Sequence, residues 1–254
     1  MVQESCEVTR VSEVAPHTFS LEFCSPGIAE TAAPGQFVNI RINRPNSPLL
    51  RRPMSVCDVE GEIVKILFNV VGTGTSLLAQ TIVSEAIDVL GPLGQGFDLT
   101  NPPGLAIIVA GGLGVAPFPF LARSLARQEV PFVSFVGAKT ANQLVLDGLP
   151  NVSAATDDGT RGYRGTVVEL LRSWLDRSAV SRQTVFACGP AAMLRSLQQF
   201  MQELKMSCQA SVETAMACGI GLCQGCPVEL VEGPQQYKLS CKDGPVFDLS
   251  KIVI

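Results

Sequence analysis

The hydrophobic pattern of the first hundred residues is one of short runs separated by turns. Runs rich in β-branched and aromatic residues are broken at sites such as Ser25-Pro26-Gly27 and Ala33-Pro34-Gly35. Short runs bounded by Gly and Pro predict strands. The predicted strands are 7–14, 18–23, 37–42, 54–58, 63–69 and 86–90, with a short helix over 77–82. Short antiparallel strands at this spacing favour a small six-stranded barrel.

From residue 105 the pattern alternates between strands and amphipathic helices. The linker Asn101-Pro102-Pro103-Gly104 precedes an apolar run over 105–110, as expected for a parallel strand buried on both faces. Further strands are predicted over 132–136, 151–156, 184–187 and 207–213, and helices over 115–127, 166–177 and 191–205. This alternation predicts a doubly wound parallel sheet. We therefore expect an α/β plus β chain in three parts: a barrel over 1–100, an α/β domain over 101–213 and a small module over 214–254.

The last part contains a cysteine-rich loop. Cys218, Cys223 and Cys226 follow the spacing C-x4-C-x2-C, and Cys241 lies further on. This is the ligand pattern of plant-type 2Fe–2S clusters. A structural zinc site or a disulfide pair is the alternative, but zinc sites favour two short C-x2-C pairs and the second pair is missing. The four cysteines are therefore the predicted metal ligands.

Local sequence around the cysteines suits a tight loop. Gly219, Gly221 and Gly225 lie between the first three thiols and are expected to supply positive φ angles and close backbone approach. A hairpin of 228–230 with 237–240, turning at 232–234, would bring Cys241 back to the loop.

Composition narrows the class of protein. The 254 residues carry a net charge of −4, with a pI of about 5.1, so a nucleic-acid-binding surface is not expected. No run of 18 apolar residues and no basic N-terminal region occurs, so neither a membrane helix nor a signal peptide is expected. Nine cysteines then indicate a reducing, cytoplasmic location and metal chemistry. The other five cysteines (6, 24, 57, 188 and 208) are expected to be buried apolar residues, and the single histidine, His17, structural or exposed.

Three stretches of the barrel carry candidate cofactor chemistry. In Arg52-Pro53-Met54-Ser55, the Arg offers a charged fork to a pyrophosphate and the Ser a hydroxyl to a flavin nitrogen. A Gly/Thr-rich turn at Gly74-Thr75 precedes the predicted helix, and a tight loop spans 90–97. Taken singly, these are also compatible with two surface arginines (Arg51 and Arg52), an ordinary helix cap and a loop.

Two stretches of the α/β domain carry candidate nucleotide chemistry. Gly111, Gly112 and Gly114, followed by Pro117, lie where the first strand turns into a helix, which lets a pyrophosphate approach. Cys188-Gly189-Pro190, with Met193 after it, follows a later strand. The alternatives are a tight βα turn and a core cysteine before a Gly-Pro turn.

In this order, the barrel motifs resemble the FAD domain of the ferredoxin–NADP reductase superfamily. G-G-x-G-x-A-P and C-G-P-x-x-M resemble its nucleotide loop and its nicotinamide-side motif. The resemblance implies FAD contacts from Arg52, Pro53, Met54, Ser55, Leu67, Phe68, Asn69, Gly74 and Thr75, and NAD contacts from Gly111, Gly112, Gly114, Pro117, Cys188, Gly189 and Pro190. Met54 departs from the superfamily, which usually has an aromatic residue there.

The order flavin, nucleotide, cluster, together with 216–223 and 241–247, resembles the electron-transfer subunits of type B dihydroorotate dehydrogenase. That family implies an oxidoreductase subunit with FAD and a 2Fe–2S cluster, paired with an FMN-containing catalytic subunit in a heterotetramer. Electrons from dihydroorotate, oxidised to orotate for pyrimidine biosynthesis, would pass through FMN, the cluster and FAD to NAD+. The alternatives are a flavin subunit of another NAD(P)H redox complex, of ferredoxin–NADP reductase, sulfide dehydrogenase or hydrogenase type, and a non-catalytic iron–sulfur sensor.

The nucleotide preference is predicted from Thr156-Asp157-Asp158-Gly159. Carboxylates repel a 2′-phosphate and accept a hydrogen bond from a ribose hydroxyl. NAD is therefore expected over NADP, although Arg161 and Arg164 lie close in sequence.

Overall fold

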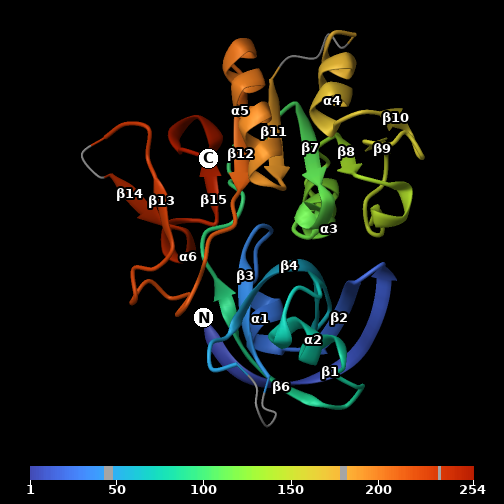
Figure 1. The fold of residues 1–254 in the computed structure, drawn as a ribbon. Helices are drawn as coiled ribbons and strands as arrows, with labels where there is room; N and C mark the ends of the chain where they lie inside the picture. The colour runs from blue at the N-terminus through green and yellow to red at the C-terminus, as the bar shows by residue number, and fades with distance from the viewer. Residues whose placement is uncertain (43–47, 178–181, 234–235) are drawn as a thin grey trace.

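A closed antiparallel barrel forms the N-terminal part of the chain. The computed structural model describes residues 1–42, 48–177, 182–233 and 236–254, and it places this barrel below a parallel sheet (Figure 1). The strand order is β1-β2-β5-β4-β3-β6, and the prediction of a six-stranded antiparallel barrel is confirmed. The strands are β1 (Val2–Ala15), β2 (Thr18–Cys24), β3 (Phe37–Arg41), β4 (Arg52–Glu60), β5 (Ile63–Asn69) and β6 (Ala86–Leu93), and the helices α1 (Pro26–Thr31) and α2 (Thr73–Ala79).

Strand β3 is buried on both of its faces. Val38 and Ile40 belong to the core inside the barrel. The alternate residues Phe37 and Asn39 face outward, since successive side chains of a strand point to opposite faces, yet they are 3% and 1% exposed. The outer face of β3 is therefore covered by another part of the chain.

Two local predictions in the barrel were wrong. Helix α2 begins at Thr73 and not at residue 77, because Thr75 closes the turn through hydrogen bonds to the backbone of Gly72. Helix α1, over Pro26–Thr31, was predicted only as a turn. Its proline stands in the first turn, where a missing N–H costs nothing.

The second layer is a seven-stranded sheet in the order β10-β9-β8-β7-β11-β12-β15, parallel except for its last strand. The predicted doubly wound sheet is thus confirmed. Its parallel strands are β7 (Leu105–Gly111), β8 (Phe132–Ala138), β9 (Val152–Thr156), β10 (Tyr163–Arg164), β11 (Gln183–Cys188) and β12 (Ser207–Ser211). The helices are α3 (Phe118–Arg127), α4 (Val167–Leu175) and α5 (Ala191–Leu204), with 3-10 turns η1 (Gly112–Val115) and η2 (Ala141–Gln143).

Strand β7 is apolar throughout because helices cover both faces of the sheet. Ala106, Ile108 and Ala110 pack with α3 on one face, whereas Leu105, Ile107 and Val109 pack with α4 and α5 on the other. Burial on both faces explains why the run 105–110 shows no polar alternation.

The barrel and the sheet domain are joined by apolar and ionic contacts. Phe97, after the last barrel strand, stacks on Phe118 at 5.8 Å and meets Phe186 edge-on at 5.5 Å. Ion pairs join Asp58 to Arg123 at 2.5 Å and Lys65 to Asp147 at 2.8 Å. These contacts hold the two parts in one orientation.

The C-terminal module shares strand β15 with the sheet. Its elements are the hairpin β13 (Pro227–Glu229) and β14 (Tyr237–Leu239), α6 (Ser240–Asp243), β15 (Val246–Asp248) and η3 (Leu249–Lys251). Strand β15 pairs antiparallel with β12 and was not predicted. The predicted turn at 232–234 includes Pro234, which lies outside the described residues. The division at 100/101 and 213/214 stays a prediction.

Several properties expected from the composition can be compared with the fold. Over the described ranges, no helix has both the length and the apolar character to cross a membrane. Cys6, Cys57, Cys188 and Cys208 are buried, and Cys24 is half-buried. His17 is exposed in the β1–β2 turn.

Replacing Cys57 by Ala should weaken the alkaline loss of stability. Burial raises the pKa of the Cys57 thiol from 9.0 to about 12, so the folded chain keeps a proton that the unfolded chain releases above about pH 8.5. Its stabilising contribution is therefore complete below about pH 8.5 and falls as the pH rises toward 12, by about 1.4 kcal/mol per pH unit. Urea unfolding at pH 8 and pH 10.5 should show a smaller loss in Cys57→Ala than in wild type. Equal losses of stability in the two proteins would contradict a raised pKa of Cys57.

Candidate functional site

A cavity of about 660 Å³ lies where the barrel meets the carboxyl edge of the sheet. Its walls come from β4 and β5, from the loop after β7, from the end of β11 and from the segment after β12. Every residue predicted to bind FAD or NAD lines this cavity except Gly74. Positions up to 138 residues apart in sequence, from Arg52 to Pro190, thus meet at one place.

The two neighbouring arginines have different surroundings. Arg51 forms an ion pair with Asp88 at 2.7 Å and donates to its backbone carbonyl at 3.0 Å. Arg52 lines the cavity, and its Nη1 donates to the carbonyl of Leu50 at 2.7 Å. Arg51 therefore has a structural partner, whereas Arg52 presents its charge to the cavity.

The predicted Gly74-Thr75 turn packs directly on Arg52. A Cβ added at Gly74 would lie 2.5 Å from Nε of Arg52, so a larger residue at 74 would push the guanidinium out of its present position. The Thr75 hydroxyl donates to the carbonyl of Gly72 and accepts from the N–H of Val71. Its proton is used in the turn, so Thr75 shapes the wall and has no O–H left for a ligand.

The glycine loop and the Cys-Gly-Pro motif interlock. A Cβ at Gly114 would lie 2.3 Å from the carbonyl oxygen of Cys188, and one at Gly111 would lie 2.6 Å from Sδ of Met193. Gly112 has a φ of +55°, the left-handed region that favours glycine. The loop needs its glycines to place backbone N–H groups beside the carboxyl end of β11.

Cys188 is a neutral thiol in this cavity. Burial, together with the charge of Glu213, raises its pKa to about 12, although a hydrogen bond with Ser211 opposes the shift. A thiol in this state can donate a weak hydrogen bond or make van der Waals contact, and it is not a nucleophile at neutral pH. The arrangement therefore suits contact with an aromatic ring rather than covalent chemistry.

Several residues of the cavity wall were not predicted from the sequence. They are Phe37, Ser211, Val212, Glu213, Thr214, Met216 and Pro245 among others. Residues 211–214 are the last residue of β12 and the three that follow it at the carboxyl edge of the sheet, and the general rule that ligands bind at such ends could have found them. Phe37 and Pro245 come from elements that only the tertiary fold brings there.

The residues of the cavity fit a polar aromatic cofactor. Thr214 Oγ1 is buried and has no hydrogen-bond partner within the described chain, and buried hydroxyls in native proteins usually have one. A bound ring with polar edges would supply that partner. The apolar walls, Met54, Leu67 and Phe68, suit its faces.

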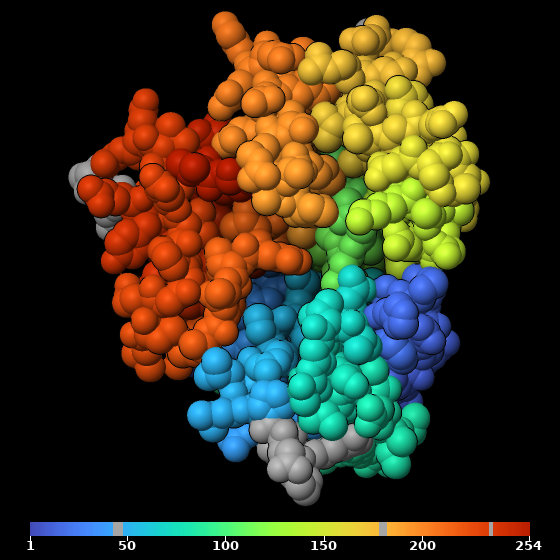
Figure 2. Space-filling view, in the orientation of Figure 1, coloured from blue at the N-terminus to red at the C-terminus, as the bar shows by residue number. Residues whose placement is uncertain are grey.

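The four predicted ligand cysteines lie together at one edge of the barrel. Sγ of Cys226 is 3.2 Å from Sγ of Cys241, and both are buried beside Phe37, Leu93 and Leu239. All of the cysteines are free thiols in the structure. Cys223 is exposed. Figure 2 shows the C-terminal module, in orange and red, beside the blue and cyan barrel.

Backbone N–H groups point at the sulfur atoms. Gly221 N donates to Sγ of Cys241 at 3.2 Å, and Cys223 N donates to Sγ of Cys218 at 3.4 Å. Burial opposes ionisation of Cys218, but N–H groups of Cys223 and Ile220 outweigh it and lower the pKa of this thiol to about 6. Burial and the neighbouring Cys226 raise the pKa of Cys241.

Glycine at two positions makes the loop possible. Gly219 and Gly221 have φ angles of +71° and +83°, as expected. The expectation for Gly225 was wrong, because the positive φ falls on Gln224 instead, at +57°. Gln224 holds this turn by donating Nε2 to the carbonyl of Gly221 at 2.8 Å.

The arrangement of the cysteine side chains bears on whether they could hold a single metal ion or a two-iron cluster. Across the described ranges, no three His, Cys, Asp or Glu side chains converge on one point as the ligands of a single ion would. A cluster with two irons takes its four cysteines as two pairs, one pair on each iron. A soft donor set with inward N–H groups fits such a cluster.

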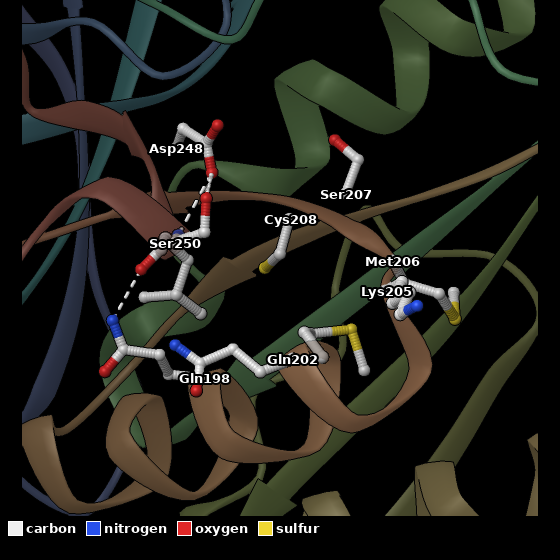
Figure 3. Close-up of a pocket in the computed structure, with 10 residues that line it drawn as sticks. Gln198, Gln202, Lys205, Met206, Ser207, Cys208, Asp248 and Ser250 are labelled. Carbon is white, nitrogen blue, oxygen red and sulfur yellow. Dashed lines mark hydrogen bonds between the residues drawn. The ribbon is translucent and has the colours of Figure 1, made fainter.

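A second hollow, of about 360 Å³, lies between the end of α5 and η3 (Figure 3). Two of the polar side chains that line it, Gln198 and Asp248, have hydrogen-bond partners within the chain. Gln198 Nε2 donates to the carbonyls of Leu249 and Ile252 at 2.6 and 2.8 Å, and Asp248 Oδ1 accepts from the hydroxyl of Ser250 at 2.7 Å. The hydrogen bonds of Gln198 therefore fasten the C-terminal tail to α5.

Comparison with known sequences gives one family. Residues 213–253 match the family model described as the iron–sulfur cluster binding domain of dihydroorotate dehydrogenase B. The dihydroorotate dehydrogenase B (NAD(+)) electron transfer subunit of Desulforamulus reducens is 36% identical, with 97% of each chain covered. The subunit of the same name from Geobacillus thermodenitrificans is 34% identical, with 99% of each chain covered.

Comparison with solved structures gives the same fold. The structure of an NADH-dependent reduced ferredoxin–NADP oxidoreductase superposes with a TM-score of 0.87 at 26% identity, covering 98% of this chain and 90% of that one. Phthalate dioxygenase reductase superposes with a TM-score of 0.64 at 18% identity, covering 91% and 87%. With more than a third of its residues identical over nearly full length to one relative, the chain belongs to the family of dihydroorotate dehydrogenase B electron transfer subunits, which are oxidoreductase subunits, as its sequence motifs predicted.

Proposed function

We propose that this subunit transfers electrons between an FMN-containing dihydroorotate dehydrogenase subunit and NAD+, and that it does so with FAD and a 2Fe–2S cluster. The observation that carries the proposal is the placement of the cavity beside the cysteine loop. Phe37 lines the cavity and also packs against Cys226 and Cys241. Flavins exchange hydride with nicotinamides and single electrons with iron–sulfur centres, so a flavin here would connect the two kinds of transfer.

The FAD site is proposed at the barrel side of the cavity. Arg52 supplies a guanidinium to the pyrophosphate, and Ser55 supplies a hydroxyl to the flavin ring. Gly74 allows the α2 turn to approach Arg52, and Leu67, Phe68 and Asn69 form the wall. Asn69 is held in place by Thr18, whose hydroxyl donates to Asn69 Oδ1 at 2.8 Å.

The NAD site is proposed at the sheet side of the same cavity. Gly111, Gly112 and Gly114 leave room for a dinucleotide backbone, and Pro117 follows them. Cys188, Gly189 and Pro190 line the cavity at the end of β11, where a nicotinamide ring would meet the sheet. A neutral Cys188 leaves the positive charge of a nicotinamide unopposed by a local thiolate.

The cluster site is proposed at Cys218, Cys223, Cys226 and Cys241. The N–H groups of Gly221 and Cys223 stabilise negative charge on the sulfur atoms. Leu222 beside Cys223 is 78% exposed and Ile220, in the same loop, is 38% exposed, and apolar residues gathered at an exposed tip suit contact with another subunit. We propose this tip as the face toward the catalytic subunit, in a heterotetramer with two copies of each chain, in the cytoplasm.

Anaerobic titration of the purified subunit tests the proposal. The protein should show flavin and iron–sulfur absorption, and NADH should bleach both. NADPH should act more slowly, because Asp157 and Asp158 follow β9 at the edge where a nucleotide ribose would lie. A colourless protein containing zinc, a cluster without flavin, or a preference for NADPH would each contradict the corresponding part. Co-purification with an FMN-binding chain would separate this function from that of other reductase subunits.

A further inference from the structure

The structure assigns a positioning role to Asn39, which no motif in the sequence indicated. We propose that its side-chain amide fixes the first cluster-ligand segment, Cys218-Gly219, at a set distance from the barrel strands that carry the flavin-side residues. The inference rests on the proposed function and adds a specific residue to it.

Asn39 stands between the two proposed cofactor sites. It pairs with Pro53 on strand β4 and with Leu90 on β6, so its backbone is part of the same strand pair as Arg52 and Ser55. Its side chain leaves the barrel on the outer face of β3, beside the cysteine loop, and is 1% exposed. The backbone of Asn39 thus lies beside the proposed flavin site, and its side chain contacts the proposed cluster loop.

The contact with the cluster loop is direct and tight. Nδ2 of Asn39 donates to the carbonyl oxygen of Cys218 at 3.2 Å. A Cβ added at Gly219 would lie 2.0 Å from the same Nδ2, and Gly219 has a φ of +71°. A side chain at 219 would therefore collide with the amide and would also have to adopt a positive φ, so both features favour glycine at this position.

The strand beneath Asn39 is braced against movement. Arg51 Nη1 lies 3.4 Å from the backbone carbonyl of Asn39, and Arg51 is itself held by the Asp88 carboxylate at 2.7 Å. Phe37, two residues earlier on the same face, packs against Cys226 and Cys241. One face of one strand thus contacts both the first ligand segment and the last ligand pair.

The hydrogen bond to Cys218 is separable from other interactions of the side chain. Within the described residues, Oδ1 of Asn39 is buried and has no hydrogen-bond partner. Removing an unpartnered buried oxygen is not expected to destabilise the fold. A residue kept only for packing should therefore tolerate an apolar or isosteric replacement, whereas a positioning residue should not.

The hydrogen bond would keep the distance between the proposed flavin site and the proposed cluster site constant. The rate of single-electron transfer falls steeply with separation, so a loop that moves away from β3 slows transfer even when both cofactors are bound. The same movement changes the surroundings of Cys218 Sγ, and the magnetic spectrum of a reduced cluster is sensitive to such changes.

A double-mutant cycle in the complete subunit tests the role. The variants are Asn39→Asp, which keeps the shape but loses the donor, Asn39→Ala, Gly219→Ala, and the double variant Asn39→Ala with Gly219→Ala. The measurements are the electron paramagnetic resonance spectrum of the reduced cluster, the rate of cluster loss in air, and the rate of cluster reduction after NADH has reduced the flavin.

We expect a specific pattern. Asn39→Asp and Gly219→Ala should each shift the spectrum and slow cluster reduction by at least severalfold, with flavin reduction by NADH unchanged. The double variant should be less impaired than the sum of the single changes, because the clash at Nδ2 is gone while the strain of a positive φ at residue 219 is present in both backgrounds. Ser25→Ala, which removes a buried hydroxyl bonded to Glu4 elsewhere in the barrel, is the control for general loosening.

The outcomes separate the inference from the proposed function. A wild-type spectrum and wild-type cluster reduction in Asn39→Asp, or strict additivity in the cycle, would overturn the positioning role alone. If Asn39→Asp does not fold, the Asn39→Ala and Gly219→Ala pair decides in the same way. A wild-type subunit that takes up no cluster would overturn both this role and the function on which it rests.

Discussion

Cys226→Ser should remove the iron–sulfur cluster and leave the flavin side of the subunit intact. Cys226 is 2% exposed and lies within a small apolar core with Cys241 and Phe37, so no solvent ligand can take its place. Loss of residues that merely support a metal ligand already costs about 10–100-fold in affinity, and loss of a soft ligand itself should cost more. Iron content, visible absorption and electron transfer to the partner should all fall together.

The control is Cys24→Ser, a half-buried thiol of the barrel. It should keep full iron content, and both variants should keep wild-type reduction of the flavin by NADH. A Cys226→Ser protein with wild-type iron and spectrum would remove this cysteine from the ligand set. Normal transfer to the partner without a cluster would remove the cluster from the electron path.

Arg52→Ala should weaken FAD binding strongly. A hydrogen bond to a charged group contributes about 1.5–3 kcal/mol, which corresponds to a rise in Kd of about tenfold to 150-fold. The Arg52 side chain lines the cavity and lies against Gly74, and its Nη1 is oriented by the carbonyl of Leu50. Calorimetric titration of flavin-free protein with FAD measures the change directly.

Arg51→Ala is the matched control, with the same side chain one position earlier. It leaves the mostly buried Asp88 carboxylate without its ion pair, so it should lower the free energy of unfolding and leave the Kd for FAD near that of wild type. Equal Kd values in the two variants, or a larger effect in Arg51→Ala, would contradict the assignment of Arg52.

This pair of arginines shows where sequence reasoning reached its limit. The resemblance of Arg-Pro-Met-Ser to a known motif selected Arg52, but the residues alone gave no physical reason to prefer it to Arg51. That choice depends on Asp88, which the barrel register brings beside Arg51 from a strand 37 positions later. Charge pairing across non-adjacent strands is a tertiary property and leaves no local signal.

Motifs whose geometry depends on their own backbone were predicted more accurately than residues that the tertiary fold positions. The glycines at 111, 112 and 114 and the C-x4-C-x2-C spacing encode their geometry locally, and the structure places both where a ligand could be held. Thr214 and Asn39 carry no such pattern, because each acquires its place only when β12 and β3 reach their neighbours. Gly225 shows the opposite error, since a glycine between two cysteines does not have to adopt the positive φ that its neighbour Gln224 takes.

The pairing of β15 with β12 has a consequence for the engineering of such subunits. Residues between these two strands, including all four ligand cysteines, form an insertion within one sheet and not a tail added after it. A chimera that exchanged everything beyond residue 213 would also replace the edge partner of β12, and a poorly matched strand would leave the hydrogen-bonding groups of β12 unpaired. Exchange of cluster types between reductases should therefore succeed when the loop alone is swapped and the closing strand, with the tail that Gln198 fastens, stays native.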